Sequence, residues 1–219
     1  MISRYAYYAN SEYDVMIDKP NGAYIFDKRR GKYFFDDDIN ALDKMSKVDT
    51  FVKVEEVKIN MLDIVFYFSF FCSLLSICIF VFLAITELQS FIHIERLHIF
   101  QGIGIILINY FLHEYAHWLT MKCFGRSPGR FALRYTSGSI GLTLDTSSAY
   151  LLPKFRRFAV FYSGVMVNIL IVTAWVLLFP QWRFSVVFTV VLIVVNLIPT
   201  KIPRTDGYNI VRYVISKKP

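Results

Sequence analysis

Long apolar runs are the feature that most constrains how this chain can fold. Four of them follow residue 60, with lengths of 22, 23, 22 and 17 residues, and only a histidine–glutamate cluster in the second interrupts them. They are 64–85, 99–121, 158–179 and 184–200. A helix that spans a bilayer needs about 20 apolar residues, and core helices of soluble proteins seldom stay uncharged on every face for so long. The pattern predicts a polytopic α-helical membrane protein with about four transmembrane helices; buried helices of a soluble protein are the alternative.

The first 60 residues differ in composition from the remainder. They carry ten Lys and Arg against eleven Asp and Glu, whereas 61–219 carry fourteen against six. The aromatic-rich runs YDVMID, AYIFD and KYFFD are separated by the turns KPNG and KRRG, which predicts strands, and DINALDKMSKV predicts a short amphipathic helix. We expect a small cytoplasmic α+β module over 1–60, which docks a peptide or caps the site, and a membrane-embedded domain over 61–219.

The charges of the loops set the orientation expected in the membrane. The segment 122–157 holds seven basic residues against one Asp, and 201–219 holds five against one. Because basic loops stay on the cytoplasmic side, we expect a multi-pass protein of a bacterial cell membrane with both termini in the cytoplasm. Lys154, Arg156 and Arg157 are expected to anchor in lipid headgroups. The positive charge is thus explained by topology, and no nucleic-acid-binding module is recognisable.

The cluster inside the second apolar run has the sequence HEYAH. His113 and His117 stand four residues apart, so both imidazoles project from one face of a helix and can bind one metal ion. Glu114 lies at the edge of that face, where a carboxylate can take a proton from a metal-bound water. H-E-x-x-H is the zinc-hydrolase motif, and ionisable groups within a membrane helix are usually functional. Histidines at a water-exposed helix end are the alternative.

Two histidines leave a zinc site one protein ligand short. Asp206 follows the fourth apolar run in the stretch NLIPTKIPRTDGYNI, where Pro199 and Pro203 break the helix. Unwound backbone at membrane depth is tolerated where it lines a protein cavity. Since the second and fourth runs are both expected to end on the cytoplasmic side of the membrane, Asp206 and the histidines are expected there. An ordinary Asp–Gly turn is the alternative.

These segments together resemble a known family. HEYAHWLTMKCFG is similar to the first motif of site-2-protease-type intramembrane zinc metalloproteases, and NLIPTKIPRTDG resembles their second motif. FRRFAVFYSGVMVNIL resembles the segment between them, and the match covers about residues 99–215. The run from Asn196 to Asp206 is about two residues longer than usual, and the loop 86–98 is too short for a PDZ insertion. The chain thus resembles minimal members, including peptide-maturation proteases.

The resemblance implies roles for individual residues. His113, His117 and Asp206 would bind Zn²⁺, and Glu114 would activate water. Asn168 would help hold the oxyanion or the substrate backbone, although from the residues alone it could equally bond a neighbouring helix. The alternating run RFALRYTSGSIGLTLDT predicts a β-hairpin, and the resemblance implies that it lies at the membrane edge, where an unfolded substrate segment could add to an open strand; a solvated connecting hairpin is the alternative.

The combined prediction is an intramembrane zinc endopeptidase. Its expected substrate is a membrane-associated peptide precursor or a single-span protein within the lipid bilayer. Two alternatives stay open at this point: a non-proteolytic binding, immunity or transporter-partner protein with a structural metal site, and a zinc enzyme that acts on a lipid or acyl group. A binding protein needs no general base, so the presence of Glu114 favours hydrolysis.

Overall fold

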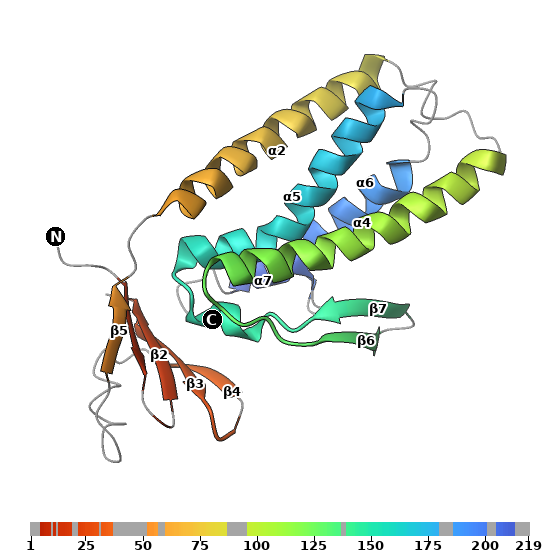
Figure 1. Ribbon diagram of the computed structural model, residues 1–219. Helices are drawn as coiled ribbons and strands as arrows, with labels where there is room; N and C mark the ends of the chain where they lie inside the picture. The colour runs from red at the N-terminus through yellow and green to blue at the C-terminus, as the bar shows by residue number, and fades with distance from the viewer. Residues whose placement is uncertain are drawn as a thin grey trace.

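The structure is a computed structural model that describes residues 5–9, 11, 13–18, 22–30, 32–36, 52–56, 60–86, 96–136, 139–179, 186–200 and 205–212. This part of the chain is mostly helical. A five-stranded sheet precedes the helices, and a two-stranded sheet lies between the second and third long helices in the sequence (Figure 1). The long helices pack side by side as a bundle, and the N-terminal sheet lies beyond one end of that bundle (Figure 1).

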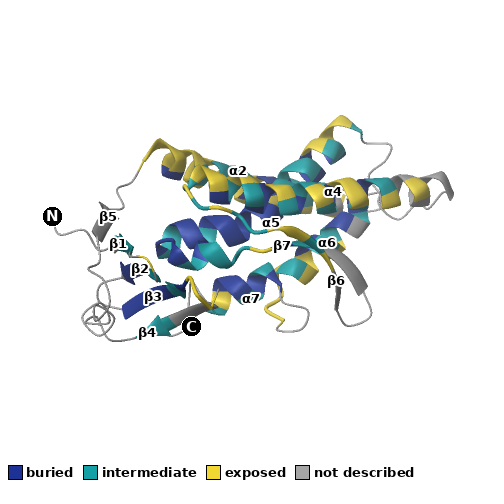
Figure 2. Ribbon diagram, turned by 60° about the horizontal axis from the view of Figure 1, so that its bottom comes forward, coloured by how far each residue is buried: buried dark blue, intermediate teal, exposed yellow. Residues whose placement is uncertain are grey.

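Three long helices correspond to the first three predicted spans. They are α2 (Met61–Thr86), α4 (Arg96–Cys123) and α5 (Lys154–Leu178). Helix α5 is central, because it packs against both α2 and α4 and against the C-terminal helices, and Figure 2 shows its surface largely buried. The 28 residues of α4 extend about 42 Å at 1.5 Å per residue.

The fourth predicted span is shorter in the structure. Helix α6 covers Val187–Leu197, only 11 residues, which rise about 16 Å and so reach about half of a 30 Å hydrocarbon core. It ends two residues before Pro199, in agreement with the predicted break. A short helix follows, α7 (Asp206–Ile210), whose first turn is capped by the Thr205 hydroxyl accepting from the Tyr208 amide.

Two helices among the described residues are long and apolar enough to cross a membrane. The segments are Met61–Leu83 and Lys154–Leu178. Large side chains along α2 stay exposed, including Phe68, Phe71 and Phe82 at 65–71%. Such a surface is costly in water but suits contact with lipid, so these helices are compatible with membrane insertion.

The N-terminal sheet is antiparallel, with strand order β4-β3-β2-β1-β5. Strands β2 (Tyr13–Asp18), β3 (Gly22–Asp27) and β4 (Lys32–Asp36) match the predicted runs. Strands β1 (Tyr5–Ala9) and β5 (Val52–Glu56) were not predicted. The predicted helix over 38–48 lies outside the described residues.

A β-hairpin follows α4, as predicted. Strands β6 (Phe131–Thr136) and β7 (Ser139–Leu144) pair in antiparallel register from Phe131 opposite Leu144 to Thr136 opposite Ser139. The two residues between the strands lie outside the described part of the chain. A 3-10 helix, η1 (Ser147–Leu151), connects the hairpin to α5 and contacts β2 and β3 of the N-terminal sheet.

The expectation that Arg156 and Arg157 anchor in lipid headgroups was wrong. Their exposed fractions are 6% and 0%. Arg156 donates two hydrogen bonds of 2.9 Å to the carboxylate of Asp63 in the first turn of α2. Arg157 donates to the carbonyl oxygens of Tyr150 and Leu152 at the end of η1. Both cations are buried and bind partners within the protein, so they stabilise packing between elements.

Candidate metal centre

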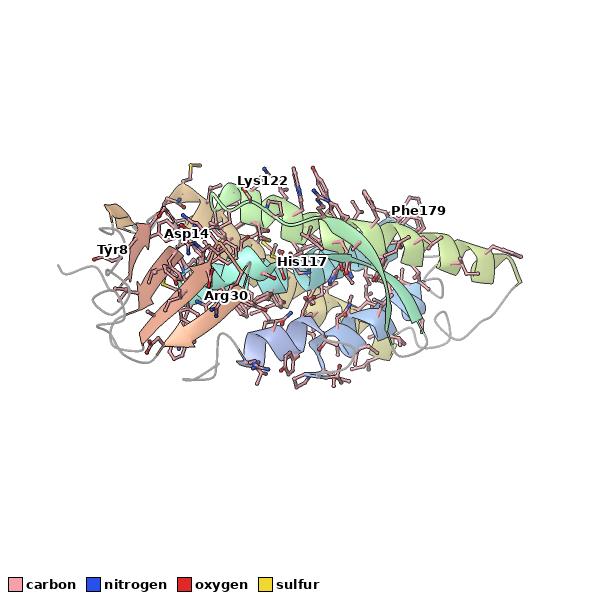
Figure 3. All side chains as sticks on the ribbon, turned by 90° about the horizontal axis from the view of Figure 1, so that it is seen from below. Tyr8, Asp14, Arg30, His117, Lys122 and Phe179 are labelled. Carbon is pink, nitrogen blue, oxygen red and sulfur yellow. The ribbon has the colours of Figure 1, made fainter. Side chains whose placement is uncertain are left out.

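The two histidines of the HEYAH sequence project together from α4. His113 and His117 are 4% and 3% exposed, and their Nε2 atoms lie 3.2 Å apart. Figure 3 shows His117 near the middle of the protein, whereas Lys122, further along the same helix, lies at its outer surface. The helical spacing therefore directs both imidazoles inward, toward α5 and α7 rather than toward the surroundings.

Asp206, the first residue of α7, meets both imidazoles. Its Oδ2 lies 2.9 Å from Nε2 of His113, and its Oδ1 lies 3.4 Å from Nε2 of His117. The side chain is 13% exposed. The neighbouring Gly207 explains how α7 fits here, since a Cβ at that position would collide with the carbonyl oxygen of Leu197. The Asp–Gly pair thus turns tightly under the end of α6 and brings the carboxylate to the histidines.

A backbone contact fixes the tautomer of His117. Its Nδ1 lies 2.6 Å from the carbonyl oxygen of Val160 on α5. Because a carbonyl oxygen only accepts, Nδ1 carries the proton in this contact, and Nε2 of the neutral ring keeps its lone pair toward His113 and Asp206. This is the arrangement of metal-binding histidines, whose second ring nitrogen donates to a carbonyl or carboxylate.

Asn168 on α5 makes the matching contact with His113. Its side-chain amide lies 3.2 Å from Nδ1 of His113, while its own Oδ1 is buried without a hydrogen-bond partner among the described residues. With the amide turned by 180°, Oδ1 accepts from Nδ1–H of His113. In that orientation Nε2 of His113 also presents a lone pair to the centre. Asn168 is 1% exposed and bonds a neighbouring helix, which was one of the two expectations for it.

The resulting donor set could hold a metal ion. The two Nε2 atoms lie 3.2 Å apart, and the Asp206 carboxylate lies 2.9 Å from His113 through Oδ2 and 3.4 Å from His117 through Oδ1. Imidazole nitrogens and carboxylate oxygens are among the protein ligands that zinc takes. Burial raises the pKa of Asp206, but positive charge on the facing imidazoles of His117 and His113, when they are protonated, outweighs it, and the pKa falls below its ordinary value. A positive charge at this position, whether a proton or a metal ion, therefore stabilises the carboxylate.

Gly164 allows α5 to approach the centre closely. A Cβ built at Gly164 would lie 2.6 Å from Nε2 of His113 and 2.7 Å from two ring carbons. Ser163, the residue before it, has its hydroxyl 3.3 Å from Nδ1 of His117. The small residues in the sequence SGV thus let the two helices pack with the imidazoles between them.

Glu114 lies beside the three converging side chains and contacts the hairpin. Its Oε2 accepts a 2.8 Å hydrogen bond from the backbone N–H of Leu144, the last residue of β7. It also interacts electrostatically with His113, His117 and Asp206. One carboxylate oxygen is therefore fixed by the backbone, and the fixed group lies next to the candidate metal site, as a general base must.

The structure brings His113, His117 and Asp206 together as a group that could hold a metal ion. Asn168 also lies there, in contact with His113. Sequence reasoning missed the contributions of Val160 and Leu144, because both act through backbone atoms that any residue type supplies. It also missed that α5 receives the ring of His113 at Gly164.

No family model, curated protein or solved structure matches this chain. The function is therefore inferred from the chemistry of the site.

Proposed function

We propose that this chain is an intramembrane zinc metalloendopeptidase of the site-2-protease type. The observation that carries the proposal is the convergence of two imidazole nitrogens and the Asp206 carboxylate. The carboxylate of Glu114, which follows His113 on the same helix, lies beside them. A purely structural metal site does not require a general base such as the Glu114 carboxylate. The substrate class is a membrane-associated peptide precursor or a single-span protein.

The residues of the chain have separate tasks in this reaction. When bound by His113, His117 and Asp206, zinc would polarise the scissile carbonyl and acidify the attacking water. Glu114 accepts the proton of that water as the new C–O bond forms. It then delivers the proton to the amide nitrogen as the C–N bond breaks, which releases an amine and a carboxylic acid.

The free edge of β7 supports binding of an extended substrate. The N–H of Leu144 points away from β6, because it donates to Glu114, whereas the N–H of Asp145 points toward Arg130. By strand alternation the backbone groups of Leu142 and Ile140 face the same way as Leu144. β7 pairs only with β6 within the described residues. A substrate strand added at this edge would lie next to Glu114.

In the proposed arrangement the chain spans a bacterial cell membrane four times, and both termini lie in the cytoplasm. α2, α4 and α5 are each long enough to span by length. α6 would form only part of the fourth span, with the site near the cytoplasmic ends of α4 and α6. The buried polar groups of the site would then be shielded from lipid by α2, α5 and the hairpin.

The test compares the wild-type chain with Glu114→Gln, which keeps the shape of the side chain but cannot accept the proton. Each is produced in cells, and membrane peptides are analysed for new termini by mass spectrometry. The proposal predicts a peptide or single-span protein that is cut by the wild type and accumulates uncut with the variant, and whose cleavage in vesicles stops on chelation. Equal cleavage with both forms refutes the assignment of Glu114. Released fatty acid without new peptide termini indicates a lipid or acyl hydrolase instead.

A further inference from the structure

Glu114 is held by the hairpin, and the hairpin is held in turn by η1. Leu144, which donates to Glu114, is 8% exposed. The next residue, Asp145, accepts from the N–H of Ser147 at 3.0 Å through Oδ1, and this contact joins the end of β7 to the start of η1. Only Asp145 and Thr146 thus separate Leu144 from Ser147, the first residue of η1. A displacement of η1 therefore moves the amide that fixes Glu114.

Two buried or partly buried arginines bind the carbonyl oxygens at the end of η1. Arg157 donates through Nη2 to Tyr150 at 2.9 Å and to Leu152 at 2.8 Å. Arg126 donates through Nη2 to Leu151 at 3.3 Å. These are the carbonyl groups that a short helix leaves unpaired at its C-terminus, so the two guanidinium groups fix the position of η1.

The same two guanidinium groups stack on tyrosines of the N-terminal sheet. Cζ of Arg157 lies 3.8 Å from the ring centroid of Tyr24 on β3, and Cζ of Arg126 lies 4.2 Å from that of Tyr7 on β1. Leu151 of η1 belongs to a buried cluster with Met16 and Tyr24. Because Arg157 is fully buried, the Tyr24 ring replaces part of the hydration that its cation has lost.

We propose that the N-terminal sheet positions Glu114, with Tyr24 and Arg157 as the positioning residues. The contacts run from the Tyr24 ring to the Arg157 guanidinium, from there to the η1 carbonyl groups, and through the hairpin end to the Leu144 amide. The sheet thus contributes to the geometry of the hydrolytic site through these contacts. The inference rests on the proposed function, since it takes Glu114 as the base.

The test uses the full chain with three substitutions. Tyr24→Leu removes the ring over Arg157, and Tyr24→Phe keeps the ring as the conservative variant. Ile25→Val alters the next residue of β3, which faces the other side of the sheet in the cluster with Val15 and Ile17, and so weakens the sheet without contacting η1. The readouts are zinc content, kcat, KM and amide hydrogen exchange of the segment 139–152.

Tyr24→Leu is expected to keep its zinc and its KM while kcat falls by about 10-fold to 100-fold, as for a displaced catalytic group. Amide exchange in 139–152 is expected to rise by about the same factor. Tyr24→Phe and Ile25→Val are expected to match the wild type in kcat and in exchange of this segment. If Tyr24→Leu folds with unchanged exchange and kcat, or if Ile25→Val shows the same loss, the proposal is overturned.

Hydrogen exchange separates this inference from the proposed function. If the wild-type chain hydrolyses no peptide, the proposed function fails and Glu114 has no base role to support. In that case faster amide exchange at 139–152 in Tyr24→Leu still shows that the sheet stabilises the end of the hairpin. Unchanged exchange refutes that structural role of the sheet as well.

Discussion

His113 and Asp206 stand 93 residues apart in the sequence, yet Nε2 of the histidine lies 2.9 Å from Oδ2 of the aspartate. The contact joins the C-terminal half of a long helix to the first residue of a five-residue helix. It forms because α5 holds both α4 and α7 against itself.

Gly164→Ala is expected to displace the ring of His113. The added Cβ would lie 2.6 Å from Nε2 of that ring, and the helices would separate or the imidazole would rotate. Zinc content and cleavage should both fall by about 10-fold or more, measured by metal analysis and by a cleavage assay.

Gly104→Ala is the matched control for that substitution. It also replaces a glycine in a long helix, but its Cβ would meet nothing within 4 Å. Zinc content and cleavage should be unchanged, with a gain of about 0.5–1 kcal/mol in stability because alanine favours helix. A loss of zinc in Gly104→Ala, or none in Gly164→Ala, contradicts the close approach at His113.

Asn168→Ala distinguishes the two roles expected for this residue. If its amide orients His113, the substitution leaves the ring Nδ1–H buried without a partner, and zinc affinity should fall by about 10-fold to 100-fold. Competition with a chromogenic chelator measures this affinity. Unchanged zinc affinity together with reduced kcat would assign Asn168 to the substrate instead.

The ion pair between Asp63 and Arg156 is expected to stabilise the contact of α2 with α5. Arg156→Gln alone leaves a fully buried carboxylate without its cation, which should lower the free energy of unfolding by about 3–5 kcal/mol. Adding Asp63→Asn restores a neutral hydrogen-bonding pair and should recover most of the loss. Thermal unfolding of the single and double variants measures the effect, and an additive loss in the double variant would contradict it.

Leu142→Pro tests whether substrate adds to the β7 edge. Proline removes one backbone donor on the side that faces away from β6, a position where an edge strand tolerates it. KM should rise, while zinc content stays the same. Thr143→Pro is the control, because its N–H faces β6 and its loss should disturb the hairpin itself. Equal KM for Leu142→Pro and the wild type would argue against strand addition.

Sequence patterns predicted the long helices well because each carries its own signal. The apolar runs gave α2, α4 and α5 within a few residues of their ends. The run 184–200 is longer than α6 as the described residues show it, and α6 ends at Leu197, before Pro199, as the predicted break requires. In the sheet, β1 and β5 were missed; they pair with each other across more than 40 residues of chain, a contact that no local pattern encodes.

The site was partly predictable for the same reason. His113, Glu114 and His117 form one local motif, and the expected topology put Asp206 on the same side as the histidines. Arg156 and Arg157 were misinterpreted because charges beside an apolar run usually mark a membrane surface. Their actual partners, Asp63 and the carbonyl groups of η1, are recognised only in three dimensions.

The most direct test of the central claim is the zinc affinity of Asp206→Asn beside that of the wild type, measured by chelator competition on protein whose folding is checked by thermal unfolding. Asparagine keeps the shape of the side chain but lacks the charge that faces His113 and His117. The wild type is expected to bind about one zinc ion per chain, and the variant at least about 10-fold more weakly. Equal affinity in the two proteins, or a folded wild type that binds no zinc, would contradict the claim that these three side chains form one metal centre.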